Sequence, residues 1–117
     1  MEERKTIVQR IKKSEKESME IAKRYYSLLS SINDLKLTER EIQLIAFTAI
    51  KGNISYSSNR EEFCTLYHSS SPTINNIISR LKKLHVLIKD SGKIKVNPAI
   101  LLNFENDIIL QISLIHG

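Results

Sequence analysis

Residues 68–98 read H-S-S-S-P-T-I-N-N-I-I-S-R-L-K-K-L-H-V-L-I-K-D-S-G-K-I-K-V-N-P, a segment in which a helical period gives way to alternation. Ser71 can accept hydrogen bonds from free backbone N–H groups, and Pro72 suits the first position of a helix. The apolar residues that follow recur at helical spacing, so they form one stripe of a 3.6-residue period. They are Ile74, Ile77, Ile78, Leu81 and Leu84. The pattern predicts a helix over residues 72–86 with one buried face.

The opposite face of this predicted helix carries short polar and basic side chains. It includes Thr73, Asn76, Arg80 and Lys83. Beyond His85 the pattern changes, and an apolar run leads into Asp90-Ser91-Gly92. After this turn, Ile94 and Val96 alternate with polar residues, which predicts a β-hairpin over residues 87–97 around a glycine-containing turn. A helix with such a face can lie in the major groove of DNA while a basic hairpin contacts the phosphate backbone.

The positive charge of the chain is concentrated in this region. The 117 residues carry a formal net charge of +5, and residues 72–97 hold six basic residues against one acidic residue. The rest of the chain balances, with twelve basic and twelve acidic residues. A basic face confined to one helix and hairpin favours a polyanionic partner, although a lysine-rich surface that serves only solubility has the same composition. The length leaves room for one domain.

The first 36 residues show the pattern of a long amphipathic helix. Apolar residues and two serines recur at alternating spacings of four and three, as in the a/d seam of a coiled coil. The seam consists of Ile7, Ile11, Ser14, Ser18, Ile21, Tyr25, Leu28 and Ile32. Such a narrow stripe needs to be buried, either against the same stripe of a second chain or on the chain's own body. We expect its apolar members to form a homodimer interface.

Two capping boxes upstream of residue 68 mark two more helices. Thr38 with Glu41 opens a helix whose broad apolar face suits the centre of a small domain, and a Gly-Asn pair ends it. Ser58 with Glu61 opens a shorter helix, separated by three serines from the one described above. Two short helices joined by a tight polar turn form a helix-turn-helix arrangement.

Residues 38–98, about half of the chain, resemble a winged helix-turn-helix DNA-binding domain. The resemblance rests on L-T-E-R-E-I-Q-L-I for the first helix, the helix at Ser58, S-P-T-I-N-N-I-I-S-R-L-K-K-L for the recognition helix and V-L-I-K-D-S-G-K-I-K-V-N-P for the wing. The closing K-I-K-V-N-P is also similar to the end of the wing in plasmid and phage replication-initiator proteins. The resemblance implies a mainly α fold with a small β wing. A winged helix-turn-helix over residues 37–98 would follow the long amphipathic helix of residues 1–36.

The resemblance also implies which residues contact DNA. In the family, the start of the recognition helix meets base edges, and an asparagine can make a bidentate pair with adenine. Arg80 would reach a guanine or a phosphate, while lysines suit phosphate contacts that give affinity without sequence information. The implied base contacts are Ser71, Thr73, Asn75 and Asn76, and the implied phosphate contacts are Lys82, Lys83, Lys89, Lys93 and Lys95. Both asparagines fit a plain polar helix surface equally well. The short wing lacks an arginine at its tip, which argues against contacts between the wing and base edges in the minor groove.

Residues 99–117 form an apolar extension. From Ile108 to Ile115 the apolar residues fit either a strand or a helix, and the enrichment in β-branched residues favours a strand. An apolar edge strand would pair with the hairpin or with another molecule.

The sequence offers no support for catalysis. Cys64 and His68 stand four residues apart, but two ligands are too few for a structural zinc site, and free cysteines are commonly just buried. With three glycines and no glycine-rich phosphate loop, we expect no enzyme, no cofactor, no metal and no small-molecule substrate. The single cysteine, the lack of an apolar leader after Met1 and the lack of a run of about 20 apolar residues predict a cytoplasmic protein without a membrane segment.

The sequence therefore predicts a double-stranded DNA-binding protein, either sequence-specific or general, that acts in transcription regulation or at the start of replication. The basic helix and the wing would bind DNA, and the N-terminal helix would make a dimer. The alternative from another class is a phage or virion structural or DNA-packaging protein. In that case the same fold would serve oligomerisation, with the heptad helix and the last apolar run as its interfaces.

Overall fold

The computed structural model describes residues 15–101, which fold into helices and one small antiparallel sheet. The elements in chain order are α2 (Glu15–Ile32), α3 (Glu39–Lys51), α4 (Ser57–Tyr67), α5 (Ser71–Lys83), β1 (Leu87–Asp90), β2 (Lys93–Val96) and a 3₁₀-helix (Pro98–Ile100). The fold is mainly helical with a two-stranded sheet, as the sequence predicts. The strand or helix predicted for residues 108–115 lies outside the described residues.

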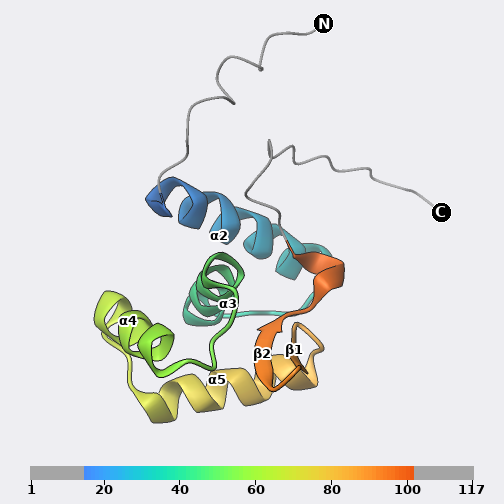
Figure 1. The fold of residues 1–117 in the computed structure, drawn as a ribbon. Coiled ribbons are helices and arrows are strands. Elements are labelled where there is room, and N and C mark those ends of the chain that lie inside the picture. The colour runs from blue at the N-terminus through green and yellow to red at the C-terminus, as the bar shows by residue number, and fades with distance from the viewer. Residues whose placement is uncertain (1–14, 102–117) are drawn as a thin grey trace, which may run out of the picture.

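Helix α3 lies at the centre of the molecule (Figure 1). Helix α2 covers one side of it, and α5 and the hairpin lie on the other side, with α4 beside α5. Residues 44–48 of α3 are all buried, which requires a helix enclosed on more than one side. Phe47 packs edge to face on Phe63 of α4, with ring centroids 5.4 Å apart. The broad apolar face predicted for this helix is confirmed.

Both ends of α3 form as predicted. Thr38 Oγ1 accepts a hydrogen bond from the backbone N–H of Glu41 at 3.2 Å, and Glu41 Oε1 accepts one from the N–H of Thr38 at 2.8 Å. The capping box is therefore complete. Gly52 follows the helix with a φ of 97°, and its N–H donates to the carbonyl of Thr48 at 2.8 Å.

Strands β1 and β2 form the predicted hairpin. They pair antiparallel with Asp90 opposite Lys93, so that only two residues make the turn. Both turn residues have positive φ angles, 54° at Ser91 and 79° at Gly92, as a type I′ turn requires. The hairpin is therefore short and closed by the turn chemistry that the sequence supplies.

The segment between α3 and α4 fastens the hairpin to the helices. The N–H of Ile54 donates to the carbonyl of Ile94 in β2 at 3.0 Å, and the N–H of Ile94 donates to Ser55 Oγ at 2.7 Å. These two bonds hold β2 to the helical core, because the backbone of a short hairpin has no other partner on that edge within the described residues.

The start of α5 differs from the prediction by one residue. Ser70, and not Ser71, caps the helix, because Ser70 Oγ accepts from the N–H of Thr73 at 3.4 Å. Ser71 is the first helical residue and Pro72 the second. Any of three consecutive serines could have filled the capping position, and sequence alone does not distinguish them.

The capping box predicted at the start of α4 is wrong. The helix begins at Ser57, and the residue before it, Tyr56, makes no side-chain cap. The chain is turned into α4 by Asn53, whose Oδ1 accepts from the N–H groups of Ser55 and Tyr56 at 2.9 and 3.1 Å. This local turn replaces the contact expected between Ser58 and Glu61.

Helix α2 packs on α3 with a buried face that is displaced from the predicted seam. Its buried residues are Ser18, Ala22, Tyr26 and Ser30, spaced four apart, and of these only Ser18 belongs to the predicted seam. The predicted seam residues Ile21, Tyr25 and Leu28 are only half-buried, and Ile32 is 60 % exposed. Small side chains let α2 approach α3 closely, and Tyr26 Oη donates to the carbonyl of Ile100 at 2.9 Å. The predicted interface residues Ile7 and Ile11 lie outside the described residues.

The cap of α5 can be tested by two neighbouring substitutions. Ser70→Ala removes the oxygen that accepts from the first turn, so we predict a loss of about 1 kcal/mol in the free energy of unfolding. Ser71→Ala should change this free energy by less than about 0.5 kcal/mol, because the Ser71 side chain is exposed and caps nothing. Urea denaturation of both variants measures the difference, and equal losses would contradict the assignment.

Candidate nucleic-acid interface

Helix α5 has one buried face and one exposed face. The predicted apolar stripe is confirmed up to Leu81, since Ile74, Ile77, Ile78 and Leu81 are buried against the rest of the domain. The helix ends at Lys83 and not at residue 86 as predicted, and Leu84 is its half-buried C-cap. The exposed face carries hydroxyl and amide side chains towards its start and lysines at its end, without an acidic residue. Its exposed residues are Ser71, Pro72, Thr73, Asn75, Asn76, Ser79, Lys82 and Lys83. A shallow hollow on this face is bordered by Asn75, Ile78, Ser79, Lys82 and Lys83.

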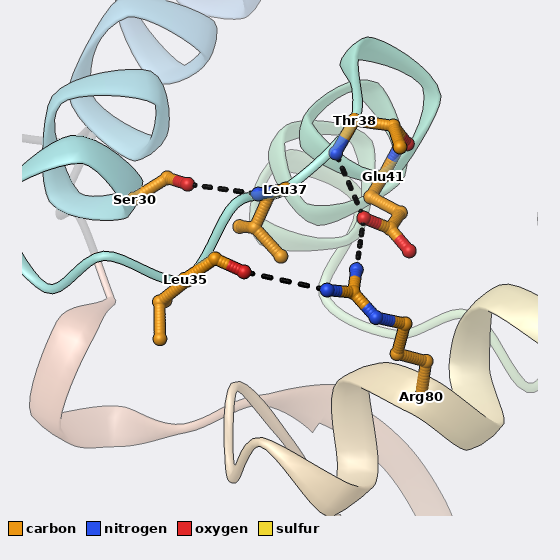
Figure 2. Close-up of polar contacts among 6 residues, drawn as sticks. All are labelled: Ser30, Leu35, Leu37, Thr38, Glu41 and Arg80. Atoms are coloured by element: carbon orange, nitrogen blue, oxygen red, sulfur yellow. Dashed lines mark hydrogen bonds and ion pairs between the residues drawn. The ribbon is translucent and has the colours of Figure 1, made fainter.

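Arg80 turns away from this face towards the helices on which α5 packs (Figure 2). Its guanidinium forms an ion pair with Glu41 and donates a hydrogen bond to the carbonyl of Leu35 at 3.3 Å. Glu41 is only 6 % exposed, so the pair joins α5 to the start of α3 and to the loop before it. The structure therefore gives Arg80 a positioning role. Its side chain is still 42 % exposed, and its contact to a guanine or a phosphate stays a prediction.

Asn75 is engaged by the neighbouring helix, whereas Asn76 is not. Arg60 Nη1 of α4 donates to Asn75 Oδ1 at 2.8 Å, and Arg60 Nε donates to the carbonyl of Ile54 at 2.9 Å. These contacts fix α4 against the start of α5. Within residues 15–101, Asn76 is exposed and its side chain makes no hydrogen bond. Of the two predicted amides, Asn76 is therefore the one whose donor and acceptor are both available.

The three predicted lysines of the hairpin differ in what their side chains contact. Lys89 is exposed at the end of β1. Lys93 Nζ lies over the ring of Tyr56, 5.1 Å from the ring centroid, which positions this cation without neutralising it. Lys95 Nζ lies 3.6 Å from Asp90 Oδ2 across the hairpin, so part of its charge is offset.

Four lysines of α5 and the hairpin have no acidic partner in the part of the chain that the structure describes. They are Lys82, Lys83, Lys89 and Lys93. An exposed ammonium group binds a phosphate as a point charge and releases counterions when it does so. Of the six basic residues counted in this region of the sequence, four therefore have no acidic partner among the described residues.

The candidate interface includes three residues that the sequence patterns did not identify. Tyr56 is 50 % exposed beneath Lys93, Arg60 holds Asn75, and Ser79 lies on the exposed face of α5. Ser79 could have been found, because it follows the asparagines and precedes the lysines at helical spacing. Tyr56 and Arg60 gave no such signal, since their role depends on contacts with other elements.

Within residues 15–101, the structure brings no three His, Cys, Asp or Glu side chains together that could hold a metal ion. Cys64 is half-buried, and His68 is exposed and follows α4 in a left-handed conformation with a φ of 52°. His68 thus serves to end the helix. Among the helices of this same range, none has both the length and the apolar character needed to cross a bilayer.

Comparisons of the chain with protein-family models, with curated proteins and with solved structures find no match. Three features of the chain itself bear on its function. They are the exposed face of α5, the lysines around it that have no acidic partner among the described residues, and the contacts that hold α5 in place.

The positioning role of Arg80 predicts a stability effect that an exposed lysine of the same helix does not have. Arg80→Ala leaves the Glu41 carboxylate nearly buried without its cation, and we predict a loss of about 1–3 kcal/mol in the free energy of unfolding. Lys83→Ala should change it by less than about 0.5 kcal/mol. Urea denaturation of both variants provides the comparison. Equal losses of unfolding free energy in the two variants would contradict the positioning role of Arg80.

Proposed function

We propose that this chain is a winged helix-turn-helix protein that binds double-stranded DNA, in transcription regulation or at the start of replication. Helix α5 would be the recognition helix in the major groove, and the β1–β2 hairpin would be the wing on the phosphate backbone. The observation that carries the proposal is the exposed face of α5, which lacks acidic residues and changes from hydroxyl and amide groups to lysines along its length.

The order and placement of the elements support this proposal. Helices α3, α4 and α5 follow one another, only residues 68–70 separate α4 from α5, and the hairpin comes directly after α5. In helix-turn-helix proteins the second helix of the pair enters the major groove. The 13 residues of α5 span about 20 Å, and the exposed side of the helix fits a groove about 12 Å wide.

The proposed contacts divide into base-reading and phosphate-binding groups. Asn76, with its amide unengaged within the described residues, would pair with an adenine edge, and the hydroxyls of Ser71 and Thr73 lie at the start of the same face. Lys82 and Lys83 would bind phosphates on one side of the groove, and the hairpin lysines would bind the backbone beyond it.

A homodimer through α2 completes the proposal. Ile21, Tyr25, Leu28 and Ile32 keep the spacings of four, three and four residues, and α3 does not bury them fully. Tyr25 also packs against the core of its own chain, and the exposed part of the stripe would contact the same stripe of a second chain. A two-fold dimer would carry two copies of α5, one in each chain.

The same partly exposed stripe favours a second candidate, a phage or virion structural or DNA-packaging protein that uses the fold for oligomerisation. An assembly held by apolar side chains depends weakly on salt, whereas binding to phosphates weakens as salt rises. Salt dependence therefore separates the two candidates.

The DNA-binding proposal predicts a steep and specific salt dependence. Four phosphate contacts give a slope of about −3 to −4 in a plot of the logarithm of the binding constant against the logarithm of salt concentration. The double variant Lys82→Gln/Lys83→Gln removes two of these contacts, so the slope should fall by about 2. Fluorescence anisotropy with a labelled random-sequence duplex measures both values.

A charge-matched double variant on α2, Lys16→Gln/Arg24→Gln, is the control and should keep the native slope. Both of its positions are exposed, and α2 lies on the side of α3 away from α5. Equal weakening in both double variants would show that only net charge matters. A lack of binding at low salt, together with large oligomers, would favour the assembly protein.

A further inference from the structure

A hollow of about 360 Å³ lies between α2, α3 and α4, remote from the exposed face of α5. Its walls are apolar and aromatic, and they consist of Met19, Phe47, Leu66 and Tyr67. Its rim is charged, and consists of Lys16, Glu20, Lys23, Lys51 and Glu62. A concave apolar surface with a few polar groups at its edge is the usual form of a site for a small organic ligand.

The aromatic wall of the hollow is rigid. The Phe47 ring packs on Phe63, and the Tyr67 ring lies 4.8 Å from Phe63 between centroids, so the three rings support one another. Phe47 and Phe63 are fully buried in the core. Lys51 Nζ lies over the Phe47 ring, 5.7 Å from its centroid, so Tyr67 is the ring that a ligand in the hollow would meet. Because Phe63 holds Tyr67 in place, the ligand would not need to order it.

Leu66 shows that part of this wall is open to solvent. It is 55 % exposed, although it borders a hollow with an aromatic wall. Covering such a side chain with an apolar ligand removes it from water, which is favourable. The hollow on α5 differs in kind, because polar residues and lysines border it and no aromatic residue does.

The rim carries an excess of positive charge. Lys23 Nζ lies 3.1 Å from Glu20, and Lys51 Nζ lies 3.0 Å from Glu62, so both acidic residues of the rim are paired. Lys16 is exposed and has no acidic partner among the described residues. The rim therefore favours an anion.

The hydroxyl of Tyr67 adds a neutral donor beside these lysines. Burial raises the pKa of the Tyr67 hydroxyl, and the nearby positive charge of Lys23 offsets this only in part. The phenol is therefore protonated at neutral pH and can donate a hydrogen bond to a carboxylate.

We propose that this hollow is a binding site for an aromatic carboxylate, with the ring of the ligand against Leu66 and Tyr67 and its carboxylate towards Lys16 and Lys23. The site is separate from the DNA-binding surface. It therefore stands or fails independently of the function proposed above, because none of its lining residues lies on α5 or the hairpin.

The test is an NMR titration of the full chain with naphthoate, a bicyclic aromatic carboxylate, in which backbone amide signals report where the probe binds. We expect saturable binding of one probe per chain, with the largest shifts in the amides of Met19, Lys23, Leu66 and Tyr67. Naphthalenemethanol, which has the same rings without the charge, should bind more weakly by roughly two- to fivefold.

Substitutions at exposed positions of the hollow keep the fold testable. Lys16→Gln should weaken naphthoate binding roughly two- to fivefold. Leu66→Glu should weaken it by about tenfold or more, since it removes apolar surface that the ring would cover and adds a negative charge to a site for an anion. Arg24→Gln, an equal loss of charge outside the hollow, should leave the affinity unchanged, and circular dichroism verifies that each variant is folded.

Three results would overturn the proposal. The first is the absence of saturable binding at millimolar naphthoate. The second is a set of shifts centred on α5 or the hairpin. The third is a folded Leu66→Glu variant that binds the probe as tightly as the native chain.

Discussion

The carboxylate of Glu41 is the point on which the position of α5 depends. It accepts the N–H of Thr38 and so starts α3, and it pairs with Arg80 and so holds α5 against that start (Figure 2). A carboxylate this poorly exposed is costly unless both partners are present. Because Arg80 is drawn inward and the apolar stripe of α5 is buried, the rotation of α5 about its axis is fixed. Asn76 and Lys83 then remain on the outer face, where a polyanion can reach them.

Elements with strong local signals were predictable from the sequence. The capping box at Thr38, the glycine-containing turn at Gly92 and the apolar stripe of α5 up to Leu81 depend on neighbouring residues only, and all three form as expected. The register of α2 was not predictable in the same way. Its heptad pattern marks Tyr25, but the buried residue is Tyr26, because the face that packs is chosen by the shape of α3 and by the small Ala22. Local periodicity identifies a helix but does not say which neighbour will cover it.

The candidate site was predictable to the extent that it depends on exposure and charge. Helical spacing alone places Asn76, Lys82 and Lys83 on the open face of α5. It does not reveal which charged groups are already paired, since the partner of Arg80 is 39 residues away in the sequence. The contact of Arg60 with Asn75 joins two helices in the same way. Long-range pairs of this kind decide which basic residues hold the fold and which are available to a ligand, and they become visible only when the chain is folded.

We propose that one surface of this protein, made of α5 and the hairpin, binds the DNA backbone. The decisive test is acetylation of lysines in the full chain, with and without duplex DNA at low salt, followed by mass spectrometry. We expect DNA to protect Lys82, Lys83, Lys89 and Lys93 while Lys16 on α2 reacts at an unchanged rate. Protection of Lys16 with no protection of the other four, or uniform rates at every lysine, would contradict it.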